Sequence, residues 1–351
     1  MMHRNAMAAR LAAVLVGLSL LLAPALAFAQ GTGGVNAPEQ REKPYVVVIS
    51  FDGFRHDYID RVETPNFDRL IARGALADGL IPVFPSKTFP NHYAIATGMY
   101  AQNHGLVDNN FWDPELGDFY TLRDREKVGD GRWYGGEPIW VTAERQGMVT
   151  AAYFFVGTEA PVAGVRPSHY RLYDGSVPNE TRVEQVIEWL RMPEETRPHL
   201  IMLYFSDADD AGHRYGPDAP EVDEAVRELD RVLGLLLDGV ATLPIADQVH
   251  FVLVSDHGMT GLDPEKAEFL DDHVDLDGIR VFGGGPYAVL WTDGDTDRRD
   301  RIVAALNKGL RHARAYTRDE IPEEFNYKHH RRAGDILVLA EPGWQIGQSR
   351  A

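Results

Sequence analysis

Carboxylate and imidazole side chains follow three apolar runs of the sequence, each at the point where the run ends. Asp52 follows the first run, Asp209 and His213 follow the second, and Asp256 and His257 follow the third. Asp209 and His213 are four positions apart, so one helical turn can present both to a single ion. Mixed oxygen and nitrogen ligands favour zinc over calcium or magnesium. A lone aspartate at a strand end is more often a cap or turn residue, but three such ends together predict two zinc ions.

Thr88 and Asn109 are the candidates for nucleophile and oxyanion donor. Thr88 lies in the segment 84–92, directly ahead of a helix-like run. An alcohol is a poor nucleophile near neutral pH, but zinc and the positive end of a helix both stabilise its alkoxide. Asn109 lies in the turn-rich segment 104–110, where its amide could donate to a phosphoryl oxyanion. The alternative roles are a helix N-cap for Thr88 and an ordinary turn for Asn109.

Strands and helices that alternate along the chain must position these side chains. Alternation of this kind predicts an α/β fold with a mostly parallel central sheet and helices on both faces. Ligands of such sheets collect beyond the carboxyl ends of the strands, where the candidate residues fall. The predicted helices are 65–75, 91–97, 181–191 and 220–238. The predicted strands are 45–51, 151–156, 199–205, 249–254 and 335–340, with 287–291 as a candidate sixth.

The composition is typical of a globular protein that would need metals to handle phosphates. The chain has 351 residues, of which 44% are hydrophobic, and this is enough for one large domain. It has no cysteine, so thiolate metal sites and disulfides are excluded. A formal charge of −18 disfavours nucleic acid polymers and anionic lipid as partners. Bound cations would have to supply positive charge to a phosphate substrate.

Residues 1–29 have the pattern of a cleaved secretory signal peptide. A basic stretch borders the apolar run 11–22, and the small-x-small sequence 27–29 is typical of a cleavage site. The alternative is an uncleaved membrane anchor, but the run is short for a bilayer span, and we expect no stable membrane insertion. The sequence thus predicts a periplasmic or secreted protein with a flexible linker at 30–43 and a folded domain at 44–351.

Five short motifs connect the chain to a known family. In order and approximate spacing they resemble those of the nucleotide pyrophosphatase/phosphodiesterases, the type I phosphodiesterases of the alkaline phosphatase superfamily. The resemblance covers most of the chain from residue 45 onward, and it implies an alkaline phosphatase-like core for the predicted domain. The motifs lie at 50–55, 87–92, 104–109, 212–217 and 255–259.

The resemblance implies a two-zinc phosphodiesterase site. Thr88 would attack phosphorus to form a phosphothreonine while Asn109 steadies a nonbridging oxygen, and water would then release a nucleoside monophosphate. The substrates would be small nucleotides or nucleotide phosphodiesters. Four residues would hold one zinc ion and two the other: Asp52, Thr88, Asp256 and His257 for the first, Asp209 and His213 for the second.

Two aromatic residues correspond to the nucleoside slot of the family. Phe89 follows the nucleophile, and Tyr170 ends the segment 164–170. A base stacked between two such rings gains about 1–3 kcal/mol by analogy with single-strand binding. Both could instead be core aromatics, and Tyr173 is a rival to Tyr170.

The resemblance also implies a third protein ligand to the second zinc ion, a histidine downstream of a segment like 334–344. No histidine follows His330 in this sequence. We therefore expect either a C-terminally incomplete domain, which we favour, or a site completed by His273, His329 or His330. The polar run around His329 is typical of a solvated loop.

Three other functions remain open at this point. A phosphomonoesterase of the same superfamily would share the zinc pair and the nucleophile, but it would need a cation for the additional phosphate oxygens. A choline-phospholipid phosphodiesterase is a second alternative. The third is a binding protein that keeps the fold without a competent second metal site.

Overall fold

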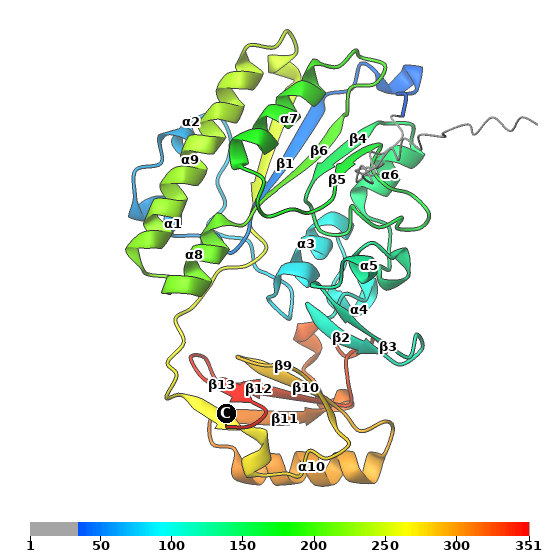
Figure 1. Ribbon diagram of the computed structural model, residues 1–351, viewed down its shortest axis with the longest axis vertical. Coiled ribbons are helices and arrows are strands. Elements are labelled where there is room, and N and C mark those ends of the chain that lie inside the picture. Colours follow the sequence, from blue (N-terminus) through cyan, green and yellow to red (C-terminus); the bar gives the residue numbers. More distant parts are fainter. Residues whose placement is uncertain (1–33, 351) are drawn as a thin grey trace, which may run out of the picture.

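A parallel sheet of five strands forms the centre of residues 34–350, which the computed structural model describes (Figure 1). Its strands lie in the order β5-β4-β6-β1-β7, and every neighbouring pair is parallel. Two of the predicted strands, at 45–51 and 249–254, are confirmed to the residue. The bounds are β1 Tyr45–Phe51, β4 Thr150–Tyr153, β5 His169–Arg171, β6 Leu200–Phe205 and β7 Val249–Val254.

Helices cover both faces of this sheet, as the alternation along the chain predicts. Val47 and Ile49 of β1 pack in the cluster that includes side chains of α2, α7 and α9, whereas Val46 and Val48 pack against the cluster with α3 and α6. Because successive residues of a strand point to opposite faces, a strand buried on both sides is apolar throughout. These helices are α2 Pro65–Ile71, α3 Thr88–Thr97, α6 Ile139–Arg145, α7 Asn179–Arg191 and α9 Pro220–Ala241.

Five further α-helices complete the set of α-helices in the described chain. One of them, α8, follows β6 directly and packs beside α9, so its first turn begins at the carboxyl end of the sheet. The others are short except α10, which lies with a second sheet below the parallel one in Figure 1. Their bounds are α1 Tyr58–Arg61, α4 Ala101–His104, α5 Arg125–Val128, α8 Asp207–Tyr215 and α10 Thr296–Gly309.

The second sheet is antiparallel, with the order β11-β12-β10-β9. The predicted strands 287–291 and 335–340 exist, but they pair in this sheet and not in the central one. Tyr287 and Val289 of β10 pack toward the cluster around α3, while Leu290 packs against α10. An apolar run indicates burial on two faces and cannot identify the sheet to which it belongs. The bounds are β9 Arg280–Gly283, β10 Tyr287–Trp291, β11 Ala313–Thr317 and β12 Ile336–Ala340.

Two ladders of two strands each accompany the two larger sheets. The antiparallel pair of β2 (Asn110–Asp113) and β3 (Asp118–Thr121) lies between α4 and α5 and contacts β9 of the second sheet. The pair of β8 (Ala267–Phe269) and β13 (Gln345–Gly347) is parallel and borders β10 and β12.

The described part of the predicted linker, residues 34–43, packs on the domain. The Asn36 side chain is buried, donates to the backbone oxygens of Glu194 and Arg197, and accepts from the Val149 amide. Three main-chain groups of the domain are thus hydrogen-bonded to this one side chain, and the small polar composition of the segment did not indicate that it packs on the domain. The predicted signal peptide lies outside the described residues. Among residues 34–350, no helix has the length and apolar character needed to cross a membrane.

Candidate active site

The carboxyl ends of β1 and β7 bring Asp52, Asp256 and His257 together. These strands are hydrogen-bonded neighbours, so the residues that follow them share one edge of the sheet. His257 Nε2 lies 3.4 Å from Asp52 Oδ1 and 3.1 Å from Asp256 Oδ2. One ligand atom from each residue falls within 4.8 Å of the other two. The strand-end prediction is therefore confirmed for this trio as a geometric cluster.

Each carboxylate of the trio has one oxygen bonded to the protein and one buried oxygen without a hydrogen-bond partner among the described residues. Asp52 Oδ2 accepts from the Tyr204 hydroxyl at 2.6 Å, and Asp256 Oδ1 accepts from the Gly53 amide at 3.1 Å. The other oxygens, Asp52 Oδ1 and Asp256 Oδ2, are orphaned. Buried polar atoms normally find partners, so these two oxygens beside an imidazole fit a bound divalent cation.

Electrostatics point to the same conclusion. Burial, and then the nearby carboxylates of Asp256 and Asp209, raises the pKa of Asp52 well above its usual range. Burial also favours the neutral acid of Asp256, but His92 and His257 outweigh it and lower the pKa of Asp256 to about 2. A cation would relieve the repulsion between the two carboxylates and keep both of them ionised.

Thr88 begins α3 and turns its hydroxyl toward the trio. Its Oγ1 lies 3.4 Å from His257 Nε2. The N-cap of α3 is Lys87, and no side chain caps that end of the helix. The alternative role of Thr88 as an N-cap is therefore wrong, and the predicted start of the helix at 91 was three residues late. The hydroxyl is free for chemistry at the positive end of a helix dipole.

His92 is a further residue of the site that sequence reasoning missed. It lies one turn after Thr88 and is fully buried. Its Nε2 is 2.8 Å from Ser50 Oγ, and its Nδ1 is 2.9 Å from the Thr88 carbonyl oxygen and 3.2 Å from Asp256 Oδ2. The spacing of four from Thr88 was the available signal, because it places His92 on the same face of α3.

Asp209 and His213 form the predicted helical pair on α8, with 3.4 Å between Oδ1 and Nε2. Asp209 Oδ1 is another buried oxygen without a hydrogen-bond partner among the described residues. Burial raises the pKa of Asp209, although His213 and His257 oppose the shift. Gly53 allows this approach: its φ is +65°, and a Cβ there would lie 2.9 Å from Asp209 Oδ1. The pair thus lies beside the trio and fits a second cation.

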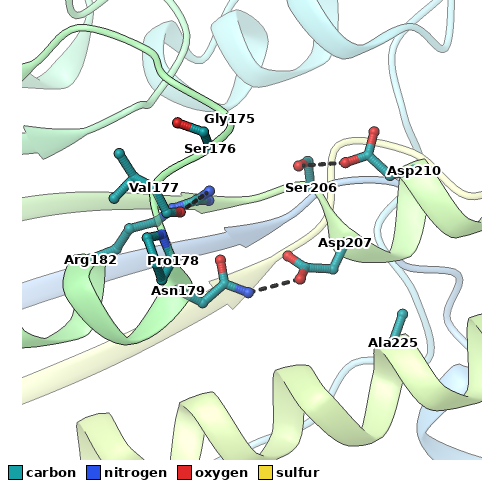
Figure 2. A pocket seen from close by; sticks show the side chains of 10 residues that line it. All are labelled: Gly175, Ser176, Val177, Pro178, Asn179, Arg182, Ser206, Asp207, Asp210 and Ala225. Atoms are coloured by element: carbon teal, nitrogen blue, oxygen red, sulfur yellow. Dashed lines mark hydrogen bonds between the residues drawn. The ribbon is translucent and has the colours of Figure 1, made fainter.

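Two other aspartates of the same helical turn belong to a different environment. Both line a pocket of about 440 Å³ (Figure 2). Asp207 accepts from the Asn179 amide at 2.8 Å, and Asp210 accepts from the Ser206 hydroxyl at 2.9 Å. Both carboxylates already have protein partners, in contrast to Asp209. Of the three aspartates, Asp209 is therefore the one suited to bind metal.

Asn109 lies beside Thr88, and a hydrogen bond from α3 orients its side-chain amide. Its Oδ1 accepts from the Phe89 backbone amide at 2.9 Å, so its Nδ2 remains to donate to a ligand. Asn109 also lines a second pocket, together with Lys87. An ordinary turn would not require this long-range bond to α3.

The aromatic prediction needs a correction. Tyr170 lies on β5 with 6% exposure inside the core cluster, because a strand side chain that points inward is covered by the helical layer. Such a position argues against a role in the nucleoside slot. Tyr173 is 41% exposed, and its ring lies 6.3 Å from that of Tyr204, which donates to Asp52. Phe89 is half-buried. The rival residue Tyr173 thus faces the site.

The three histidines considered as a further metal ligand lie elsewhere. His329 pairs with Glu323 at 3.5 Å, His330 lies against Gly105, and His273 lies against Gly309. Within residues 34–350, none of the three belongs to the cluster formed at the carboxyl ends of β1 and β7. They do not complete the pair on α8.

Comparisons with known proteins identify the family of the chain. Residues 46–351 match the family model for type I phosphodiesterase / nucleotide pyrophosphatase. Mouse ectonucleotide pyrophosphatase/phosphodiesterase family member 1 is 34% identical over 88% of this chain and 35% of its own length. Human family member 5 is 33% identical over 89% of this chain and 65% of its own length. The chain thus spans about a third of the length of the first of these relatives.

Solved structures of family member 5 share the fold. The murine protein superimposes with a TM-score of 0.82 and 33% identity, over 88% of this chain and 81% of that chain. An inactive threonine-to-alanine variant of it, in complex with AMP, gives a TM-score of 0.82 with 32% identity over 88% and 82% of the two chains. The chain belongs to the type I phosphodiesterase/nucleotide pyrophosphatase family, and its core has the alkaline phosphatase-like fold.

Proposed function

We propose that this protein hydrolyses phosphodiester or pyrophosphate bonds of nucleotides and releases nucleoside monophosphates. The observation that carries the proposal is the position of the Thr88 hydroxyl. It lies at the start of α3, does not cap that helix, and is 3.4 Å from His257 Nε2 of the trio. In the inactive murine relative with AMP bound, one threonine is replaced by alanine, and this supports a nucleotide substrate and a threonine nucleophile for the present protein. Family membership supports the phosphodiester class of bond.

We assign two zinc ions to the site. Asp52, Asp256 and His257 would hold one together with the Thr88 hydroxyl, and Asp209 with His213 would hold the other. The orphaned oxygens of the three aspartates support this assignment. When bound, the zinc ions supply positive charge that stabilises the threonine alkoxide and the phosphoryl oxygens.

Three residues have separate roles in the proposed reaction. The Thr88 alkoxide oxygen, which has already lost its proton, forms a bond to phosphorus as the bond from phosphorus to the leaving oxygen breaks, and this gives a phosphothreonine whose phosphate still carries the nucleoside. Asn109 Nδ2 donates to a nonbridging oxygen, because its Oδ1 is already held by the Phe89 amide. His92 fixes the carbonyl of Thr88 and lies against Asp256. Water then hydrolyses the phosphothreonine and releases the nucleoside monophosphate.

Phe89 and Tyr173 are the aromatic residues that we assign to the nucleoside. Tyr173 is exposed beside Tyr204, and Phe89 follows the nucleophile directly. Stacking of a base on an aromatic ring is worth about 1–3 kcal/mol and tolerates different bases. The signal-like segment 1–29 supports a periplasmic or secreted location for this activity.

A comparison of two chromogenic substrates tests the proposal. The purified protein in zinc-containing buffer should release p-nitrophenol from p-nitrophenyl thymidine monophosphate much faster than from p-nitrophenyl phosphate. Chelation should abolish this activity, and added zinc should restore it. Preference for p-nitrophenyl phosphate would indicate a phosphomonoesterase instead. Release from p-nitrophenyl phosphorylcholine alone would indicate a choline-phospholipid phosphodiesterase, and no hydrolysis at all would favour a binding protein.

A further inference from the structure

The last turn of α8 carries the candidate ligand His213 on the surface of the molecule. His213, Arg214 and Tyr215 are all exposed, so their own side chains do little to hold this end of the helix. The loop 216–219 follows directly, and its Pro217 is buried. The position of His213 therefore depends on how this loop is attached to the rest of the domain.

Three side chains from the segment after β1 hold the loop, and α1 lies beside the end of α8 (Figure 1). Arg61 Nη1 donates to the Pro217 carbonyl oxygen at 2.8 Å, and the Tyr58 hydroxyl donates to the same oxygen at 3.3 Å. Arg55 Nη2 donates to Asp218 Oδ1 at 2.7 Å. Each guanidinium carbon also lies 5.1 Å from the centre of the Tyr58 ring, so the ring supports both arginines. We call these three residues the clamp.

Arg55 differs from the other two clamp residues because it also contacts the loop after β7. Its Nη1 donates to the Met259 carbonyl oxygen at 3.3 Å, two residues beyond His257. Gly258 allows this approach, since a Cβ there would lie 3.3 Å from Arg55 Cγ. Asp57 accepts from Nε at 2.6 Å and from Nη2 at 3.0 Å and so fixes the plane of the guanidinium. One side chain thus connects the three segments that carry candidate metal ligands.

We propose that Arg55 is a positioning residue that sets the two candidate cation sites relative to each other. The inference rests on the two-zinc site of the proposed function. Arg55 does not touch a candidate ligand side chain or the substrate; it acts through Asp218 on the α8 side and through the Met259 carbonyl on the β7 side. Residues outside the ligand set that hold the ligands in place commonly change metal affinity by about tenfold to a hundredfold when they are replaced.

Hydrogen exchange of the metal-free protein tests whether Arg55 holds the end of α8. In Arg55→Met the amides of residues 212–216 should exchange about tenfold faster than in the wild type, as expected when a charge-assisted hydrogen bond that holds this end is lost. The amides of α7 should exchange at the wild-type rate. Arg69→Met is the matched control, because it removes only a surface ion pair with Asp238 at 2.8 Å and should change neither region.

Zinc binding tests whether this attachment matters to the site, which a merely structural role would not affect. Competition with a chelating indicator measures the dissociation constants of zinc. Arg55→Met should weaken zinc binding about tenfold or more, and Arg55→Lys should recover part of the loss, because an ammonium can reach one of the acceptors but not all of them. Asp218→Asn is a second variant that should retain the fold, since the Asp218 side chain is 74% exposed, and it should weaken zinc binding in the same direction.

The two measurements separate the inference from the function on which it rests. Unchanged exchange at the end of α8, unchanged zinc affinity in Arg55→Met, or an equal loss of zinc affinity in Arg69→Met would overturn the inference. A wild-type chain that binds no zinc would instead refute the zinc assignment of the proposed function, and the inference with it.

Discussion

The Thr88 hydroxyl combines three properties that favour a nucleophile: it is not used as a cap, it lies at a helix N-terminus, and it is next to the trio of Asp52, Asp256 and His257. Thr88→Ala should lower hydrolysis of p-nitrophenyl thymidine monophosphate at least about a thousandfold, as the loss of a nucleophile does in other enzymes. AMP binding, followed by calorimetry, and the urea midpoint should change little. Thr88→Ser is the matched control and should retain activity. If Thr88→Ala turned over substrate nearly as fast as Thr88→Ser, Thr88 would not be the nucleophile.

Asp209 and Asp210 are neighbours on α8 with different surroundings, and this difference makes a paired prediction. Asp209 has an orphaned buried oxygen beside His213, whereas Asp210 is bonded to Ser206. Asp209→Asn should therefore lower the zinc retained per chain after dialysis against metal-free buffer, measured by elemental analysis. Asp210→Asn should leave it unchanged. If the two variants retain equal amounts of zinc, the ligand assignment moves away from Asp209.

Sequence reasoning was most successful for residues whose positions are defined by strand ends. Asp52, Asp256 and His257 follow parallel strands, and such strands must end at one edge, so their meeting follows from the topology alone. Tyr170 and Tyr173 are a contrasting case. β5 is only three residues long, too short for its alternation to indicate which tyrosine points inward. Orientation there depends on the layer that covers the strand, which no local pattern contains.

At the scale of elements, Arg332 is one of the residues that attach the antiparallel sheet to the rest of the molecule. Its guanidinium is 3% exposed, lies 2.6 Å from Asp113 Oδ2 of β2, and donates to the carbonyl oxygens of Gly105 and Trp133 at 2.7 Å. Arg331 pairs with the same carboxylate, but its side chain is 34% exposed. The segment that precedes β12 is thus tied to β2, α4 and the loop before α6.

This contrast predicts different costs for two adjacent arginines. Arg332→Met should lower the free energy of unfolding by about 3–5 kcal/mol, because it breaks a buried ion pair and leaves carbonyl oxygens without donors. Arg331→Met should cost less than about 1 kcal/mol, since water can replace an exposed partner. Urea unfolding measures both values. Equal costs would mean that the pairing of Asp113, and not the burial of Arg332, dominates the attachment.

Two strands of the second sheet could not be predicted from the sequence. The runs 287–291 and 335–340 were identified as strands, yet β9 and β11 were not, because Arg280–Gly283 and Ala313–Thr317 mix charged, small and apolar residues. Their pairing comes from contacts with β10 and β12. Pairing partners far apart in sequence are selected by tertiary packing, which overrides weak local propensity.

At the scale of the whole molecule, His104 lies where α4, the loop before α6 and the segment before β12 converge. It is fully buried, its ring lies 5.1 Å from that of Tyr93, and its Nδ1 accepts from the Leu106 amide at 3.1 Å. Burial lowers the pKa of His104 to about 3, and His330 and Arg332 add to the shift. The folded protein therefore holds this imidazole neutral across the physiological range.

The stability of the whole fold should consequently decrease in mild acid. Below a pH of about 6.5 the unfolded chain binds a proton at His104 that the folded protein does not bind, so the free energy of unfolding falls as pH falls toward the folded pKa. Between pH 7 and pH 5 this histidine alone should contribute a loss of about 2 kcal/mol. Urea unfolding at both pH values measures this loss. Between pH 7 and pH 5 the free energy of unfolding of His104→Gln should fall by about 2 kcal/mol less than that of the wild type, whatever the stability of the variant at pH 7. An unchanged pH dependence in the variant would mean that the imidazole reaches water, and a proton, without unfolding of the three elements around it.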